Sequence, residues 1–512
     1  MKNFSRHGRR RTVKAKTLMI QGTASHAGKS VIVAGICRAL VRKGLSVAPF
    51  KSQNMSLNSF VTDDGSEIGR AQAMQAEAAR TPPLADMNPV LLKPAGEDLS
   101  QVMVMGRPEG HMSFEQYGKF RLRALEAVRA SLGRLMSGFD VVVIEGAGAA
   151  AEINLARTEI VNMSVARLAD APVLLVGNID RGGVFASLAG TFELLDPEDR
   201  ERVRGMIINR FRGNISLLSG GLKFLEKKTG RPVLGVVPHI DGLFLDDEDS
   251  VSLDDDRTPR PGDLKVCVPR LPRISNFTDL RPLEMEDGVA VSYVRSPAGM
   301  EGADAVVLPG SKATMEDLKF FKQSGMAAAV RRLCGAGVPV IGICGGYQMM
   351  GSVLADRGAF DSTAGEEEGL GVFAARTEME EAKTLERTEA VVKNGGAVFA
   401  AIEGERVSGY EIHMGRTRLE EGGRPFLSRP DGSADGAVSR RGNVYGTYLH
   451  GIFENDNLRG EFVRYLSEKR GADAPAAESF ALRREKQYDL LADRIEKSLD
   501  MDAVMSIVFN RK

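Results

Sequence analysis

The sequence predicts an α/β protein with two domains, each built on a parallel β-sheet that is flanked by helices. Short apolar runs ending in glycine or polar residues alternate with helical segments along most of the chain. Near residue 20, a strand, a glycine-rich loop and a helix follow one another, as a phosphate-binding loop (P-loop) in a doubly wound sheet requires. A second strand–turn–helix elbow surrounds residue 344. An acidic, proline-containing segment between the two indicates a domain boundary.

The chain has 512 residues, enough for more than one domain. We expect a basic flexible tail at 1–16, a P-loop domain at 17–245, a linker at 246–263 and a second α/β domain at 264–512. The tail is rich in arginine and lysine but lacks the apolar core of a signal peptide.

The bulk composition excludes several classes of protein. The 68 basic and 68 acidic side chains balance, which argues against a general nucleic-acid binder or a binder of anionic membranes. No apolar run is long enough to span a bilayer. The four cysteines have no metal-like spacing, and this favours a reducing, cytoplasmic location. Composition predicts no particular oligomeric state.

The first strand, at 17–21, leads into the loop GTASHAGKS and then into an apolar helix. Backbone N–H groups of such a loop cradle phosphate oxygens. Lys29 would neutralise the terminal phosphates of ATP, and the Ser30 hydroxyl would reach Mg²⁺. The bland alternative, a glycine-rich helix start with a surface lysine, fits the flanking strand and helix poorly. The predicted ATP-binding residues are Gly22, Thr23, Gly28, Lys29 and Ser30.

Carboxylates at two places are candidate magnesium ligands. A buried strand at 140–145 ends in Glu145, and a carboxylate at the tip of a strand facing a phosphate loop suits a metal ligand. The acidic stretch with Asp63, Asp64 and Glu67 either supplies another ligand or is a solvated turn. The sequence does not choose among these three, and we take Glu67 as the candidate.

Polar residues that follow other strands predict the rest of the first site. The strand at 47–51 runs into an amide-rich loop with Gln53 and Asn54, a composition suited to binding a ligand. Asn154 follows the strand of Glu145, and Asp180 and Arg181 follow a strand at 173–178. Because parallel strands end at one sheet edge, we expect these side chains to lie near the phosphate loop and contact the substrate.

In the second domain, an apolar strand ends in Cys344, and two glycines and a helical segment follow at once. The positive end of a helix favours a thiolate, so Cys344 is a candidate nucleophile. The alternative is a small buried cysteine that fills space. A strand at 305–308 leads to Gly310, whose backbone N–H, with that of Gly345, would form an oxyanion hole. His450, which ends a later strand, is the candidate base. His413 either lines the site or supports it.

The motifs CGGYQ (344–348) and HG (450–451) resemble those of a class I glutamine amidotransferase domain. The phosphate loop is one residue longer than the common pattern and resembles that of dethiobiotin synthetase. From about residue 17 to the C-terminus, the chain is similar to the cobyric acid synthases of cobalamin biosynthesis. This resemblance also rests on the motifs EGAG (145–148), IDRGGVFA (179–186), PRISNFTD (272–279), LPGSKAT (308–314) and YGTYLHGIFE (445–454).

This resemblance implies a P-loop domain followed by a flavodoxin-like amidotransferase domain. Cys344 would attack the amide of L-glutamine, His450 would shuttle the proton, and Gln348 would help to bind the glutamine. The first domain would use ATP and Mg²⁺ to convert a corrinoid carboxylate into an acyl phosphate, which the released ammonia attacks. Family members amidate the b, d, e and g carboxylates of adenosylcobyrinic acid a,c-diamide and so form adenosylcobyric acid.

One departure concerns the residue that orients the histidine. The wider amidotransferase class has a glutamate two residues after the histidine, and here Ile452 takes that place, as in the cobyric acid synthases. What holds His450 is therefore open, and we expect slow glutamine hydrolysis in the absence of the other substrates. Ser52 stands where the family often has proline.

Three other functions compete with this one. The related cobyrinic acid a,c-diamide synthase is disfavoured by the IDRGGVFA block and the histidine–glycine ending. A P-loop ATPase with a non-catalytic amidotransferase-like domain is disfavoured by the intact Cys344 and His450. A glutaminase subunit that passes ammonia to a separate partner is unnecessary, because the phosphate loop lies in the same chain.

Overall fold

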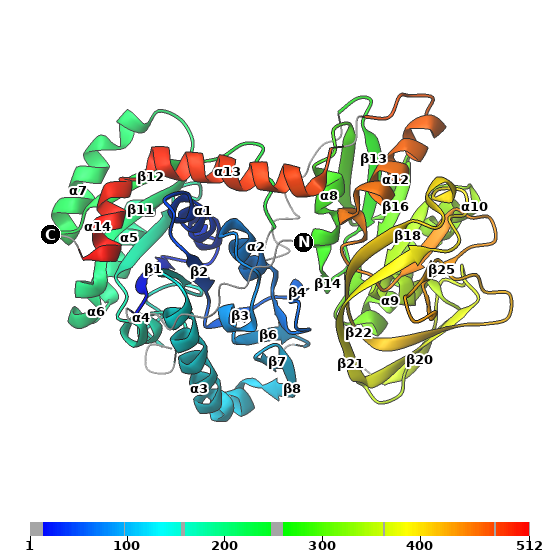
Figure 1. Cartoon of the computed structure of the whole chain (residues 1–512), viewed down its shortest axis with the longest axis horizontal. Helices are drawn as coiled ribbons and strands as arrows, with labels where there is room; N and C mark the ends of the chain where they lie inside the picture. Colours follow the sequence, from blue (N-terminus) through cyan, green and yellow to red (C-terminus); the bar gives the residue numbers. More distant parts are fainter. Residues whose placement is uncertain are drawn as a thin grey trace.

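A computed structural model describes residues 14–96, 98–154, 159–246, 260–361, 364–475 and 478–510. Most of the expected tail and linker, residues 1–13 and 247–259, lies outside the described residues. Two α/β bodies lie side by side, and one long helix near the C-terminus runs from the second back to the first (Figure 1).

The first domain has a six-stranded parallel sheet in the order β12-β11-β10-β1-β9-β2. Its strands are buried apolar runs, as expected for a sheet covered by helices on both faces. The strands are β1 Lys16–Gly22, β2 Val47–Phe50, β9 Val141–Glu145, β10 Val173–Asn178, β11 Val203–Phe211 and β12 Val233–Pro238. The helices are α1 Lys29–Arg42, α2 Arg70–Ala78, α3 Phe114–Gly138, α4 Met163–Ala169, α5 Val184–Leu194, α6 Pro197–Arg202 and α7 Ser219–Thr229.

The chain between β2 and α3 builds two small sheets beside the main one. They lie on the side of the first domain that faces the second domain (Figure 1). One is a four-stranded sheet of β3 Gln53–Met55, β6 Val90–Pro94, β7 Leu99–Val104 and β8 Arg107–Ser113. The other is a hairpin of β4 Ser59–Val61 and β5 Glu67–Gly69.

The second domain has a main sheet in the order β15-β13-β16-β18-β26-β25, parallel except for β25. When the five parallel strands alone are numbered along the chain, their order is 2-1-3-4-5, which is the flavodoxin-like order. The expected fold class is therefore confirmed for both domains. The strands are β13 Leu264–Pro269, β15 Val289–Val294, β16 Ala305–Leu308, β18 Val340–Ile343, β25 Ala437–Val438 and β26 Val444–Thr447. The helices are α8 Arg281–Glu284, α9 Thr314–Gln323, α10 Met326–Gly335, α11 Gly345–Met350 and α12 Asp456–Lys469.

A second, mostly antiparallel sheet packs beside this one and contains a long hairpin that reaches the first domain (Figure 1). Its strands are β19 Val353–Asp356, β20 Gly365–Glu368, β21 Ala375–Val392, β22 Arg406–Leu419, β23 Leu427–Ser428 and β24 Ala434–Asp435. Two short strands, β14 Ile274–Ser275 and β17 Gly310–Ser311, pair near the carboxyl end of the main sheet.

The last two helices, α13 Phe480–Ser498 and α14 Met501–Phe509, pack on the first domain. Tyr488, Leu491 and Ile495 form one apolar face that joins the core beneath α1. Arg38, on α1, is fully buried and binds Glu485 and Asp489. Although α13 and α14 lie within the range expected for the second domain, 264–512, they pack on the first domain. The apolar face of α13 is buried there against α1.

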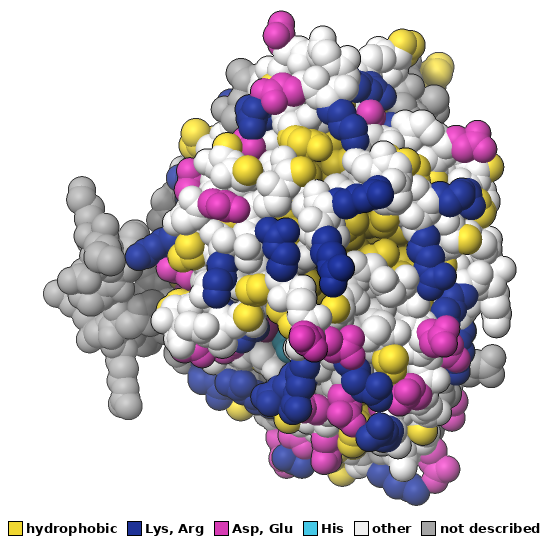
Figure 2. Space-filling view, turned by 90° about the vertical axis from the view of Figure 1, so that its right-hand side faces the viewer, with side chains coloured by type: hydrophobic (Ala, Val, Ile, Leu, Met, Phe, Trp, Pro, Cys, Tyr) yellow, Lys and Arg dark blue, Asp and Glu magenta, His cyan; other side chains and the backbone are white. Residues whose placement is uncertain are grey.

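The surface agrees with the balanced charge of the sequence. On the face at the amidotransferase end, basic side chains are interspersed with acidic and apolar ones (Figure 2). Among the described residues, none of the helices combines the length and apolar character of a bilayer-spanning segment.

Candidate active site

Cys344 stands at the tight turn between β18 and α11. Its backbone has φ 52° and ψ −110°, a conformation that residues other than glycine rarely adopt. The glycines that follow allow close packing: a Cβ on Gly346 would lie 2.2 Å from the Leu308 carbonyl oxygen. The turn raises the thiol at the carboxyl edge of the sheet, where α/β folds place their sites. The prediction of an elbow at Cys344 is confirmed.

His450 lies beside this cysteine, and a carboxylate that we did not predict holds it. Its Nδ1 is 2.7 Å from Oδ2 of Asp279, and the other Asp279 oxygen accepts a 2.8 Å hydrogen bond from the Gly451 N–H. Burial alone would lower the pKa of His450, but Asp279 and a hydrogen bond with Cys344 raise it to about 10. The imidazole is therefore protonated at neutral pH.

Asp279 provides the carboxylate contact to His450 that Ile452, in place of a glutamate, cannot provide. Ile452 is buried in the core, as its apolar character requires. Asp279 belongs to a short 3₁₀ turn, Phe277–Leu280, and ends the motif PRISNFTD. This motif contributes to the family resemblance, but the sequence alone predicts no role for its aspartate. The side chain that completes a cysteine, histidine and carboxylate arrangement thus comes from 171 residues before His450.

The expected oxyanion glycines lie close to the triad. A Cβ on Gly310 would be 3.3 Å from Cε1 of His450, and one on Gly345 would be 2.8 Å from the Ser311 nitrogen. Gln348 is buried one turn after Cys344, where it accepts from Thr314 Oγ1 at 3.3 Å and donates to the Tyr448 hydroxyl at 3.2 Å. The roles of Gly310, Gly345 and Gln348 stay predictions.

His413 lines a cavity beside Cys344, but both of its ring nitrogens have partners. Nε2 is 2.9 Å from Glu411, and Nδ1 is 2.7 Å from the Gly415 carbonyl oxygen. The ring also stacks on Tyr448. This arrangement favours the supporting role over direct proton transfer.

A cavity of about 40 Å³ lies beside Cys344. Three lysines and Asp361 contribute to its walls. Lys312 and Lys383 belong to the amidotransferase domain, whereas Lys93 comes from β6 of the first domain. The wall of the cavity at the cysteine is therefore built from both domains.

The phosphate loop joins β1 to α1 as expected. Gly28 has φ 89°, and a Cβ there would lie 2.0 Å from Nδ2 of Asn209, so only glycine fits. Lys29 Nζ donates to the carbonyl oxygens of Ala24 (3.1 Å) and Gly148 (2.9 Å). A Cβ on Gly22 would sit 3.0 Å from this ammonium group. Thr23, also predicted here, donates its backbone N–H to Val176.

Glu145 and Ser30 lie together at this loop. The Ser30 hydroxyl donates to Glu145 at 2.9 Å, and Lys51 Nζ is 3.0 Å from the same oxygen. Burial would raise the pKa of Glu145, but Lys51, Gln75 and Lys29 lower it, so the carboxylate is ionised. A hydroxyl and one carboxylate fit Mg²⁺, which takes oxygen ligands and keeps phosphate and water oxygens as the others. The sequence did not predict that Lys51 and Gln75 contact Glu145, although Lys51 stands at the end of a predicted strand.

The expectation for Glu67 needs correction. Glu67 is fully buried, and its two carboxylate oxygens bind Lys93 and Lys383 rather than facing Ser30 and Glu145. Asp64 caps its own turn through Thr62 and Ser66, and the exposed Asp63 lies 3.5 Å from Arg387. Among the described residues, no group of three or more His, Cys, Asp or Glu side chains is arranged to hold a metal ion.

The five predicted corrinoid residues have different surroundings. Asn54 is buried and donates to Gln72 at 2.9 Å, whereas Gln53 accepts from the Tyr117 hydroxyl. Asp180, Arg181 and Asn154 are exposed. Asn178, which ends β10 just before Asp180, donates to the His26 carbonyl of the phosphate loop. The structure thus places Asp180 and Arg181 at the phosphate-loop edge, and it makes Asn54 a support rather than an open ligand.

Comparisons with known proteins match both domains in order. The "CobQ/CobB/MinD/ParA nucleotide binding domain" matches residues 18–251, and the "CobB/CobQ-like glutamine amidotransferase domain" matches residues 265–458. The chain is 49% identical to a cobyric acid synthase of Sorangium cellulosum, over 96% of this chain and 99% of that protein. It is 47% identical to one from Pelotomaculum thermopropionicum, over 96% and 97% of the two chains. Identity of this size over nearly the whole length, with both domains in the same order, shows that the chain belongs to the cobyric acid synthase family.

Proposed function

We propose that the chain uses glutamine and ATP to amidate the b, d, e and g carboxylates of adenosylcobyrinic acid a,c-diamide, giving adenosylcobyric acid. The observation that carries this proposal is that one chain of this family pairs a Cys344–His450–Asp279 triad with a phosphate loop whose Ser30 contacts Glu145. The first group suits the release of ammonia, and the second suits the activation of a carboxylate.

In the amidotransferase domain, the Cys344 thiolate attacks the side-chain amide carbon of glutamine. His450 gives its proton to the departing nitrogen, so ammonia leaves and a thioester remains on the sulfur. His450 then takes a proton from water as the water attacks the thioester, releasing glutamate and the thiolate. Asp279 keeps Nδ1 engaged throughout, so that Nε2 is the nitrogen that exchanges protons.

In the first domain, ATP supplies the phosphoryl group that makes a corrinoid carboxylate reactive. A carboxylate is a poor electrophile, whereas an acyl phosphate has a good leaving group. Lys29 and the loop N–H groups would hold the phosphates, and Ser30 with Glu145 would hold Mg²⁺. Lys51 and Gln75 fix the Glu145 carboxylate in this position. Ammonia then displaces phosphate and forms the amide.

The direct test incubates the protein with ATP, glutamine and each candidate corrinoid, and counts new amides by mass spectrometry. We expect four amidations of adenosylcobyrinic acid a,c-diamide. Cys344→Ala should abolish the reaction with glutamine and leave the reaction with ammonia, whereas Lys29→Ala should stop both. Amidation of cobyrinic acid instead would favour the related a,c-diamide synthase. Loss of both reactions in a folded Cys344→Ala variant would contradict the division of labour.

A further inference from the structure

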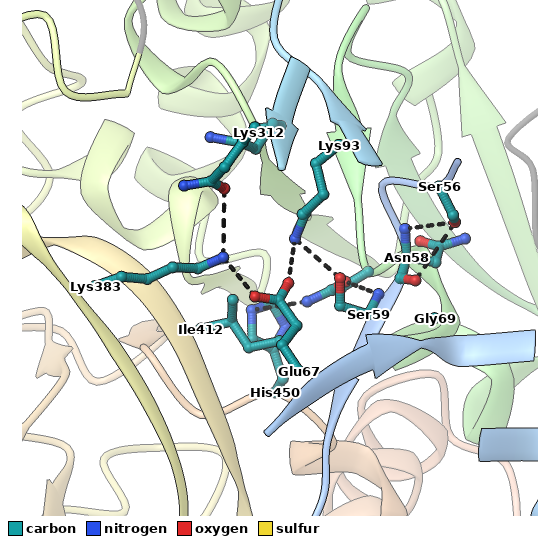
Figure 3. Close-up of polar contacts among 12 residues, drawn as sticks. Ser56, Asn58, Ser59, Glu67, Gly69, Lys93, Lys312, Lys383, Ile412 and His450 are labelled. Carbon is teal, nitrogen blue, oxygen red and sulfur yellow. Dashed lines mark hydrogen bonds and ion pairs between the residues drawn. The ribbon is translucent and has the colours of Figure 1, made fainter. Parts of the chain in front are cut away.

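A buried ion cluster joins the two domains at the wall of the Cys344 cavity (Figure 3). Its centre is Glu67, on β5 of the first domain. Lys93 Nζ, also from the first domain, lies 2.6 Å from one Glu67 oxygen, and Lys383 Nζ, from β21, lies 2.5 Å from the other. All three side chains are almost completely buried.

The cluster carries an excess of positive charge. Two ammonium groups share the single carboxylate of Glu67, while the nearby Lys312 has Asp361 as its own partner at 3.4 Å. The other partners of Lys93 and Lys383 are neutral: Lys93 donates to Ser59 Oγ, and Lys383 donates to Oε1 of the Gln101 side chain. A buried charge without a counter-charge is costly, so this wall of the cavity suits an anion.

Lys383 responds to this excess. Burial lowers its pKa, Glu67 raises it, and Lys93 and Lys312 lower it again, so that it falls to about 7. A bound anion would shift that pKa back towards the value of an ordinary lysine. Glu67 stays ionised, because the two lysines outweigh the effect of burial on its pKa.

Free glutamine presents an anion at the end opposite to its amide. If Cys344 attacks the amide, the α-carboxylate and α-ammonium groups lie at the far side of the same cavity. The ammonium group would share the Asp361 carboxylate with Lys312. The cavity, of about 40 Å³, holds only a few waters, so the long lysine side chains must shift when glutamine binds.

We infer that Lys93 of the first domain and Lys383 of the amidotransferase domain together bind the α-carboxylate of glutamine, with Glu67 holding both lysines in place. This inference rests on the proposed use of glutamine. The glutamine pocket is then complete only where the two domains meet. Lys93 of the ATP-binding domain thus contributes to glutamine specificity.

The test compares L-glutamine with L-glutaminamide, whose α-carboxylate is replaced by a neutral amide. Both carry the side-chain amide that Cys344 attacks. Lys93→Met is a clean variant, because Glu67 keeps Lys383 as its partner. We expect it to raise the KM for glutamine roughly ten- to hundredfold, the factor that corresponds to losing one hydrogen bond to a charged group. The preference for glutamine over glutaminamide should fall by a similar factor, and Lys383→Met should behave in the same way.

Arg387→Met is the matched control. Arg387 also bridges the domains, through Asp63 and the face of Phe60, but it does not line the cavity. Its substitution should leave the preference unchanged, and Lys93→Arg should retain most of it. The preference is a ratio within one preparation, so it does not depend on the folded fraction. An unchanged preference in both methionine variants would overturn the inference and make the lysines mere links between domains. Wild-type protein that hydrolyses neither compound would instead contradict the proposed function.

Discussion

At the scale of single residues, the chemistry depends on a carboxylate that reaches His450 from far away in the chain. Asp279 and His450 are 171 residues apart, yet their side chains meet at 2.7 Å. Cys344 and His450 could be predicted because each follows a strand, and parallel strands deliver their ends to one sheet edge. Asp279 lies on a short turn, which has no such rule, and Ile452 gave the only signal that another carboxylate was needed.

Asp279→Asn should slow glutamine hydrolysis about a hundredfold or more, because His450 loses the partner that orients it and stabilises its charge. The pH profile of kcat provides a readout that a merely structural role would not change. Activity should fall as pH rises through the pKa of His450, which is about 10 with Asp279 in place. Removing the negative charge lowers that pKa, so the alkaline limb should move to lower pH. A limb that stays in place would show that Asp279 does not set the proton affinity of His450.

At the scale of elements, glycine-rich turns were predictable and long-range pairings were not. The phosphate loop and the Cys344 elbow each have a local cause, since only particular residues fit their backbone. The acidic stretch around Glu67 was predicted to bind Mg²⁺, but the Glu67 carboxylate is paired with lysines instead. Its counter-charge, Lys383, lies 316 residues away on a strand of the other domain. The apolar face of α13 likewise has a clear period, but its partner α1 lies near the opposite end of the chain.

Leu491→Ala tests the packing of α13 on the first domain. Leu491 is fully buried against α1, so the change should lower the free energy of unfolding of that domain by about 2–5 kcal/mol. Urea unfolding monitored by circular dichroism would measure this change. Leu482→Ala is the matched control, because Leu482 is on the same helix but 60% exposed, and its effect should stay within about 0.5 kcal/mol. Equal effects of the two variants would show that α13 is not part of that core.

At the scale of the whole molecule, the first domain docks on the second beside His450. Phe60, Ile68, Tyr410 and Ile412 form an apolar cluster between the β4–β5 hairpin and β22. Beside it, the Ser59 N–H donates to Asn276 Oδ1 at 2.9 Å, and the Asn276 amide nitrogen lies 3.3 Å from Nε2 of His450. The first domain therefore reaches His450 through a single intervening side chain. Domain order and fold class could be read from sequence, but this docking could not, because no local pattern encodes it.

If the proposed function is correct, ammonia freed at Cys344 is used at the phosphate loop of the same molecule. The most direct measurement supplies glutamine labelled with ¹⁵N in its side-chain amide, together with ATP, corrinoid and an excess of unlabelled ammonium, and follows the isotope in the product by mass spectrometry. We expect the new amides to carry mainly ¹⁵N, since nitrogen passes between docked domains before it can be protonated and diluted. New amides that carry the isotope ratio of the bulk ammonium would contradict it.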